Sequence, residues 1–389
     1  MQPVNLKRTP AMRIGIDMHT FDGIHQGSRT HCIELFSRAM KVGSEFQFFV
    51  FLAEPEKLKE ATERFSYRNV EFVKMDHQSA PARLLFQLPA LSRKYGLDLL
   101  HTQYIVPPFS ACPTAVTVHD ILFESHPSFF TKSFRLRSKV LCRTSARKSA
   151  LVFSVSEFSR QELVRLYSLR GDRVTTLVNG VDLVRFHPGD EGADVVQTLG
   201  LTPGTYLLTV GRLEPRKNHA GLLRAYNKLP RPRPKLAIVG QRDFGYQEIF
   251  GLIETLGLKD DVLLFEGIED SILPALYRNA LAFVYPTWAE GFGMPLLEAM
   301  ASGVPVLTSS TTSLPEVAGD AAIYLQPDDI DSINSAMMKV ISDAELRSLL
   351  IQRGFARTKL FSWDESALQL VRSYREYFGA TSDSPSLVV

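Results

Sequence analysis

Two glutamates, Glu290 and Glu298, lie eight residues apart in the segment 285–305. The apolar run before them predicts a buried strand, and Pro295 predicts that a helix begins a few residues after the loop. One carboxylate therefore belongs to a glycine-containing loop and the other to the first turns of a helix. Carboxylates accept hydrogen bonds from neighbouring hydroxyls, and the amides at a helix N-terminus suit a phosphate. We expect a ligand that carries both groups, such as a sugar nucleotide.

This stretch resembles the E-x7-E signature of the group 1 family (family 4) of retaining glycosyltransferases, which have the GT-B fold. The resemblance implies that Glu290 holds hydroxyls of the transferred sugar and that Glu298 takes the ribose diol. For Glu298, a simple favourable interaction with the helix dipole is an equal alternative. The donor-binding residues implied between the two glutamates are Gly291, Phe292, Gly293, Met294, Pro295 and Leu296.

Two cations follow the predicted strand 206–210, which opens a second strand–helix pattern. Arg212 and Lys217 stand on either side of a turn, and they resemble the family's paired cations that bind the donor diphosphate. A charge-assisted hydrogen bond contributes about 1.5–3 kcal/mol, so two such residues could replace a metal ion. We expect no metal or other cofactor. Arg216, between them, is interpreted as a surface residue.

Two further candidates come from the N-terminal half. His119 follows the β-branched run 113–118, and ligands of doubly wound sheets gather at such strand ends. It resembles the family's histidine that reaches the donor sugar, although a lone histidine is more often structural. Gly23 and Gly27 do not form a dinucleotide fingerprint, and Gly27 is the better candidate for a loop near the phosphates, with a plain turn as the alternative. Glu316 is interpreted as an ordinary helix-start residue.

The catalytic set predicted from these residues is His119, Arg212, Lys217 and Glu290. With 389 residues and alternating strands and helices, the chain predicts an α/β protein with two Rossmann-like, doubly wound parallel sheets facing across a cleft. We expect an acceptor-binding domain at 1–190 and a nucleotide-sugar domain at 191–361. A C-terminal helix at about 362–380 is expected to pack back on the first domain, as the family implies.

The segment 129–148 predicts a strongly basic helix without an acidic residue. Arg135, Lys139, Arg143 and Arg147 repeat every four residues along it. Three interpretations remain open: a solvated surface, a seat for an acceptor's pyrophosphate, and a contact with anionic lipid through the segment 132–148. At about 1 kcal/mol per basic residue, the last could hold the protein to a membrane reversibly.

Bulk properties exclude several other classes of protein. The formal net charge of +2 argues against a nucleic-acid partner, and three widely spaced cysteines indicate neither a disulfide framework nor a zinc cluster. The sequence shows no signal peptide and no long apolar run. We therefore expect a cytoplasmic protein, with peripheral association to the inner face of the plasma membrane as a hypothesis.

The predicted reaction is transfer of a hexose from a nucleoside-diphosphate sugar to a hydroxyl of a glycan or lipid-diphosphate-linked saccharide, in polysaccharide biosynthesis. General resemblance to bacterial O-antigen mannosyltransferases makes GDP-mannose the first choice of donor, and a UDP-sugar is the alternative. The family implies retention of the anomeric configuration. A sugar-nucleotide epimerase and a catalytically silent binding subunit remain as alternatives of other classes.

Overall fold

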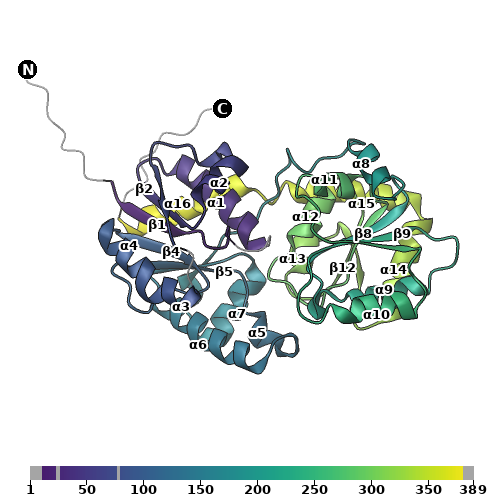
Figure 1. Cartoon of the computed structure of the whole chain (residues 1–389), viewed down its shortest axis with the longest axis horizontal. Coiled ribbons are helices and arrows are strands. Elements are labelled where there is room, and N and C mark those ends of the chain that lie inside the picture. Colours follow the sequence, from purple (N-terminus) through teal and green to yellow (C-terminus); the bar gives the residue numbers. More distant parts are fainter. Residues whose placement is uncertain (1–10, 23–26, 77–78, 380–389) are drawn as a thin grey trace, which may run out of the picture.

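Two parallel sheets lie side by side in the computed structural model, which describes residues 11–22, 27–76 and 79–379 (Figure 1). Within these residues the first sheet has the strand order β3-β2-β1-β4-β5-β6-β7 and the second has the order β10-β9-β8-β11-β12-β13. Every strand pairing is parallel. Both orders reverse beside the first strand of the sheet, as in doubly wound nucleotide-binding folds. The predicted fold class is confirmed.

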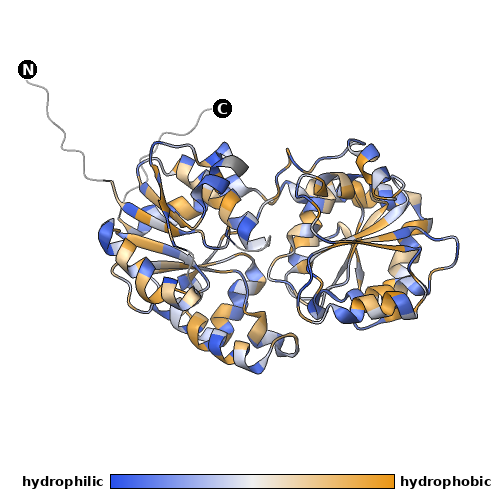
Figure 2. Cartoon of the chain, viewed as in Figure 1, coloured by the Kyte–Doolittle hydropathy of each residue, from blue (hydrophilic) through white to orange (hydrophobic). Residues whose placement is uncertain are grey.

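The strands form from short apolar or β-branched runs, and those in the middle of each sheet are buried on both faces, whereas the edge strands β3, β7, β10 and β13 are partly exposed. Figure 2 shows the strands in mostly hydrophobic colours, with hydrophilic residues concentrated on the outer helices. The strands of the first sheet are β1 (Arg13–Asp17), β2 (Gln47–Leu52), β3 (Val70–Lys74), β4 (Leu99–Gln103), β5 (Thr114–Val118), β6 (Leu151–Ser154) and β7 (Val174–Thr176). Those of the second are β8 (Tyr206–Val210), β9 (Lys235–Val239), β10 (Val262–Phe265), β11 (Ala282–Tyr285), β12 (Val306–Ser309) and β13 (Ala322–Leu325).

The helices cover both sheets and leave the carboxyl ends of the strands open towards the other domain. In the first half these helices are α1 (Gly27–Val42), α2 (Pro55–Ala61), α3 (Ala80–Ala82), α4 (Leu88–Lys94), α5 (Leu122–Ser125), α6 (Lys132–Lys148) and α7 (Glu157–Tyr167). In the second half they are α8 (Ala193–Thr198), α9 (His219–Asn227), α10 (Gln247–Thr255), α11 (Leu273–Arg278), α12 (Met294–Ala301), α13 (Leu314–Ala318), α14 (Ile330–Ser342), α15 (Ala344–Thr358) and α16 (Trp363–Tyr377).

The last helix, α16, belongs to the core of the first domain. Trp363, Leu370 and Tyr374 are buried there, and the Tyr374 hydroxyl lies 2.6 Å from Nδ1 of His101 on β4. The start of α16 lies so close to the segment after β7 that a Cβ on Gly180 would be 2.4 Å from the Trp363 backbone nitrogen. Only glycine allows this approach. It brings together the two segments by which the chain passes between the domains, one after β7 and one before α16.

Candidate active site

A cavity of about 330 Å³ lies between the domains, where the switch points of the two sheets face each other. Both domains contribute to its wall, as expected for a ligand held at the carboxyl ends of parallel strands. Of the predicted site residues, those that line it are Gly27, His119, Arg212, Lys217, Glu290, Gly291, Phe292, Gly293, Met294, Pro295 and Glu298. Leu296 does not line it, because its side chain is buried in the core and its amide donates to the Gly293 carbonyl at 3.1 Å.

Glu290 is the centre of a buried hydrogen-bonded cluster. Its Oε1 accepts hydrogen bonds from Lys217 Nζ at 2.6 Å, the Tyr285 hydroxyl at 2.9 Å and the Thr287 hydroxyl at 3.0 Å. Its Oε2 lies 3.0 Å from the Arg216 guanidinium. Oε1 is therefore fully occupied, and Oε2 keeps the capacity to accept a hydrogen bond from a ligand hydroxyl.

The charge of Glu290 is fixed by its neighbours. Burial alone would raise the pKa of this carboxyl, but Arg216 and Lys217 outweigh burial and lower its pKa from 4.5 to about 2. A carboxylate that holds its proton so weakly is a poor general base near neutral pH. It is suited to binding and orienting hydroxyls.

The interpretation of Arg216 as a surface residue is wrong. The side chain is buried between two carboxylates, and its guanidinium pairs with Glu214 at 2.6 Å as well as with Glu290. It also donates to the Ala289 carbonyl at 2.6 Å. Burial would lower the pKa of Arg216, but the two glutamates raise it above its usual value. Arg216 therefore holds the Glu290 loop in place.

Lys217 reaches the cavity, whereas the guanidinium of Arg212 is turned partly towards another residue. Nζ of Lys217 donates to the Tyr285 hydroxyl at 2.8 Å and to Glu290, which leaves one of its three hydrogens for a ligand. Arg212 lines the cavity but is paired with Asp243. A diphosphate there would have to compete with Asp243 for Arg212.

Backbone amides complete this side of the cavity. Gly293 precedes α12 with a φ of 106°, a conformation that favours glycine, and it turns the loop into the helix. The N-terminus of α12 therefore lies at the cavity wall, where Pro295 has no N–H and the Leu296 amide is bonded to Gly293, so that of its first three residues only Met294 has an amide left for a ligand. Partial positive charge at this helix end adds to the cationic character of the wall.

Glu298 lies one turn further along α12. Its Oε2 accepts a hydrogen bond from the Tyr277 hydroxyl at 2.8 Å. Burial raises the pKa of Glu298 to about 7, against smaller opposing effects of Tyr277 and Arg185. The two glutamates of the signature therefore have opposite electrostatic environments, one strongly ionised and one near its titration point.

His119 faces Glu290 from the first domain. Its Nε2 lies 2.8 Å from Gln103 Oε1, which can only accept, so Nε2 carries the hydrogen and Nδ1 is an acceptor. Burial lowers the pKa of His119 well below its usual value, so the imidazole is neutral. The ring packs edge-on against His31, with centroids 4.7 Å apart. His31 was not predicted, because it occupies an ordinary inward position on α1.

Two glycines allow the domains to approach at the cavity. A Cβ on Gly291 would lie 2.7 Å from the His119 carbonyl oxygen, and one on Gly27 would lie 2.9 Å from Cε of Met294. Each glycine therefore touches the opposite domain. Gly23 lies outside the described residues.

The domains are also joined by hydrogen bonds that the sequence did not predict. The Ser156 and Ser159 hydroxyls donate to the Gly291 carbonyl at 2.7 and 3.1 Å. The Glu316 carboxylate accepts from the Glu157 and Phe158 amides at 2.8 and 3.0 Å. Glu316 stands in the first turn of α13, as interpreted from the sequence, and it also caps α7 of the first domain from the second domain.

The basic helix α6 keeps only Lys139 and Arg147 of the predicted stripe exposed. Arg135 and Arg143 are half-buried, and Arg147 donates to the Tyr167 carbonyl at 3.0 Å. Lys139 pairs with Glu124 at 3.0 Å. The exposed residues of α6 are apolar and basic together, and they include Lys132, Phe134, Leu136, Arg137, Lys139, Val140, Leu141, Arg147 and Lys148.

The described part of the chain has neither a metal-binding cluster nor a membrane-spanning helix. No group of three or more His, Cys, Asp or Glu side chains there could hold a metal ion. Over the same residues, no helix combines the length and hydropathy of a membrane span.

Comparison with known proteins agrees with this geometry. Residues 197–357 match the family described as "Glycosyl transferases group 1", and residues 25–185 match "Glycosyltransferase Family 4". The structure resembles that of HepE from Anabaena in complex with UDP-glucose, with a TM-score of 0.77 and 19% identity over 94% of this chain and 100% of that one. At this identity the likeness supports the fold alone.

Two curated relatives from Escherichia coli have sugar-transfer functions. The O-antigen chain mannosyltransferase B is 38% identical over 266 residues, which cover 67% of this chain and 69% of the relative. The serotype-specific mannosyltransferase WbdA is 30% identical over 241 residues, which cover 60% of this chain but only 29% of WbdA. From the matched domains, the GT-B architecture and the similarity to mannosyltransferase B, the chain belongs to the group 1 glycosyltransferases.

Proposed function

We propose that this glycosyltransferase moves mannose from GDP-mannose to a hydroxyl of a glycan or lipid-diphosphate-linked saccharide, with retention of configuration. The observation that carries the proposal is the Glu290 cluster, which places an ionised carboxylate beside Lys217 and opposite the α12 N-terminus. The name of the 38% identical relative supports mannose. A UDP-sugar is the alternative donor, because the structurally similar HepE was solved with UDP-glucose.

The proposed reaction builds negative charge on the leaving diphosphate and positive charge on the anomeric carbon. Lys217, Arg212 and the Met294 amide at the start of α12 would stabilise the diphosphate without a metal ion. Oε2 of Glu290 would accept a hydrogen bond from a hydroxyl of the transferred sugar, and Nδ1 of His119 would accept another from the same sugar.

Retention would follow from attack on the face that the diphosphate leaves. The leaving phosphate would take the proton of the acceptor hydroxyl, so the reaction needs no protein nucleophile. Glu290 is therefore assigned to positioning of the sugar. Glu298 would accept hydrogen bonds from the two hydroxyls of the ribose. The ionised carboxylate suits this better than the protonated form, because both of its oxygens are acceptors.

Binding of nucleotides is the first test of this proposal. We expect GDP to raise the thermal unfolding midpoint more than UDP, ADP or dTDP. In a second assay with the matching sugar nucleotides, we expect slow hydrolysis of GDP-mannose and of none of the others. Stabilisation by UDP only would replace the mannosyl donor with a UDP-sugar and leave the transferase assignment in place. If no nucleotide bound, the site assignments would be wrong.

A second part of the proposal concerns the membrane. Leu136 and Val140 are 68% and 55% exposed and lie one turn apart on α6, with Arg137 between them. Apolar side chains flanked by cations suit the surface of an anionic bilayer. We propose that α6 holds the protein reversibly on the cytoplasmic leaflet, where a lipid-linked acceptor would lie.

The Leu136→Asp/Val140→Asp variant should lose most sedimentation with anionic vesicles, because two carboxylates replace the inserting side chains. Leu360→Asp is the matched control, since Leu360 is 67% exposed on the other domain. Equal recovery of the wild-type protein with neutral and anionic vesicles would remove the membrane proposal.

A further inference from the structure

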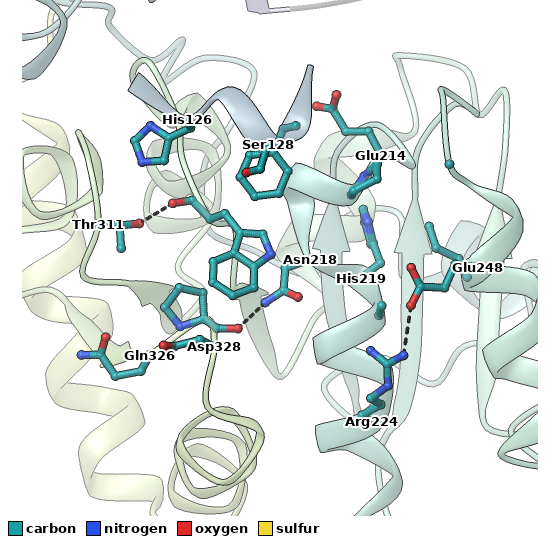
Figure 3. A pocket seen from close by; sticks show the side chains of 17 residues that line it. His126, Ser128, Glu214, Asn218, His219, Arg224, Glu248, Thr311, Gln326 and Asp328 are labelled. Carbon is teal, nitrogen blue, oxygen red and sulfur yellow. Dashed lines mark hydrogen bonds and ion pairs between the residues drawn. The ribbon is translucent and has the colours of Figure 1, made fainter. Parts of the chain in front are cut away.

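A second cavity, of about 690 Å³, lies between the domains beside the donor cavity. Figure 3 shows His126 and Ser128, which follow β5 of the first domain, facing Thr311, Gln326 and Asp328 of the second. Phe129 and Trp288 also line it, one from each domain, with ring centroids 6.2 Å apart. Its size falls within the range of about 300–1,000 Å³ for ligand sites.

The charges of this lining disfavour an anion. Its one guanidinium, that of Arg224, is paired with Glu248 at 3.0 Å. Glu214 is paired with Arg216 behind the wall. The Asp328 carboxylate has no hydrogen-bond or ion-pair partner among the described residues and is exposed. A phosphate would therefore meet an unpaired carboxylate and no free cation, whereas a neutral ligand with hydroxyl groups would meet an acceptor.

Two other features favour a sugar ring. Trp288 is only partly buried and offers an aromatic surface on which the C–H face of a sugar can pack. His219, which also lines the cavity, is 2% exposed, and its Nδ1 has no partner among the described residues. A buried polar atom of this kind calls for a hydrogen-bonding neighbour, which a bound hydroxyl or its ordered water would supply.

Both walls of this cavity continue from the donor cavity. On one side, the Trp288 amide donates to the Arg216 carbonyl at 2.9 Å, and Arg216 pairs with Glu290. On the other side, Asp120 lines the donor cavity and α5 leads from it to His126. A linear saccharide whose end reaches Glu290 would therefore run along the domain boundary towards Trp288.

We propose that this second cavity binds a neutral sugar residue of the acceptor glycan, at a distance from the hydroxyl that receives the transferred sugar. The inference rests on the proposed function and adds a subsite that favours long acceptors. Trp288 would supply the packing surface, and Asp328 would accept hydroxyl hydrogen bonds.

The test uses the full chain with mannose, mannobiose, mannotriose and mannotetraose as acceptors. Trp288→Ala should raise KM for mannotetraose at least about tenfold and change KM for mannose little. Asp328→Asn should give a smaller change of the same kind, and Trp288→Phe should restore most of the affinity. Phe109→Ala is the control, because Phe109 is 74% exposed and lines neither cavity.

Tryptophan fluorescence measures binding of the saccharide directly, so it tests the subsite independently of the transfer reaction. The sequence has two tryptophans, so in Trp363→Phe the emission comes from Trp288 alone, and mannotetraose should shift it. If the wild-type protein transfers sugar but neither Trp288→Ala nor Asp328→Asn changes KM with acceptor length, the subsite is wrong and the proposed function stands. A shift with inorganic pyrophosphate instead of mannotetraose would also overturn it. If no sugar nucleotide is hydrolysed, the proposed function fails, and the mannotetraose titration still decides whether the cavity binds sugar.

Discussion

Glu290→Gln should lower the rate of sugar transfer by about 10²- to 10³-fold, the usual effect of removing one preorganised electrostatic contact in an active site. The amide keeps the size of the side chain but removes the charge that Arg216 and Lys217 surround. We expect kcat to fall more than the affinity for the nucleotide, because Glu290 is assigned to the sugar. Single-turnover transfer measured beside nucleotide titration separates the two effects.

The same substitution should destabilise the protein. The lowering of the Glu290 pKa from 4.5 to about 2 corresponds to about 3 kcal/mol of folding free energy. Because the pKa in the folded state is depressed, this stabilisation is complete above about pH 4.5 and is lost as the pH falls towards 2. Glu290→Gln should therefore flatten the acid limb of the stability profile. Transfer at the wild-type rate would refute the assignment of Glu290 to the sugar site.

The second large effect is expected for Lys217→Met. This variant keeps the length of the side chain and removes one of the two cations proposed to bind the leaving diphosphate. We expect kcat/KM for the donor to fall by about 10²-fold or more. Lys217→Arg should recover little of this, because the planar guanidinium does not fit between Tyr285 and Glu290.

An exposed ion pair supplies matched controls for both substitutions. Glu254 and Lys259 lie 2.9 Å apart and are each about two-thirds exposed, so Glu254→Gln and Lys259→Met should leave rate and stability nearly unchanged. In the buried pair, the double variant Lys217→Met/Glu290→Gln should be less unstable than the sum of the single variants. Additive effects there would show that the two residues act independently.

The sequence predicted most strands because buried parallel strands are uninterrupted apolar runs, such as Ala282–Tyr285. It missed β13, whose residues are mostly only partly buried at the edge of the second sheet and follow a glycine-ended helix directly. The signature glutamates could be placed because a loop and a helix N-terminus have local signals. Local signals do not reveal partners such as Tyr277, which approaches Glu298 from another helix.

The error at Arg216 has a physical cause. Arg216 stands in a short turn, where a charged residue is ordinarily solvated, and only the two carboxylates brought to it by folding make it a buried residue. For the same reason the sequence could not show that Glu316, besides starting α13, contacts α7 across 159 positions of sequence. Ion pairs and hydrogen bonds between residues that are far apart in the sequence depend on how the elements pack in the folded protein. The hydrophobic periodicity of the sequence carries no information about this packing.

The contribution of α16 to the first domain has a consequence for how the protein is made. The seven strands of the first sheet are all present once residue 176 has been synthesised, but Trp363, Leu370 and Tyr374 of its core come almost two hundred residues later. The residues of the second domain are therefore synthesised before the first domain can finish folding. In most proteins of two domains, by contrast, the N-terminal domain can fold first. Until then the apolar face of α1 that α16 covers in the folded protein lacks this cover, and we expect the nascent chain to be prone to aggregation until its last helix emerges.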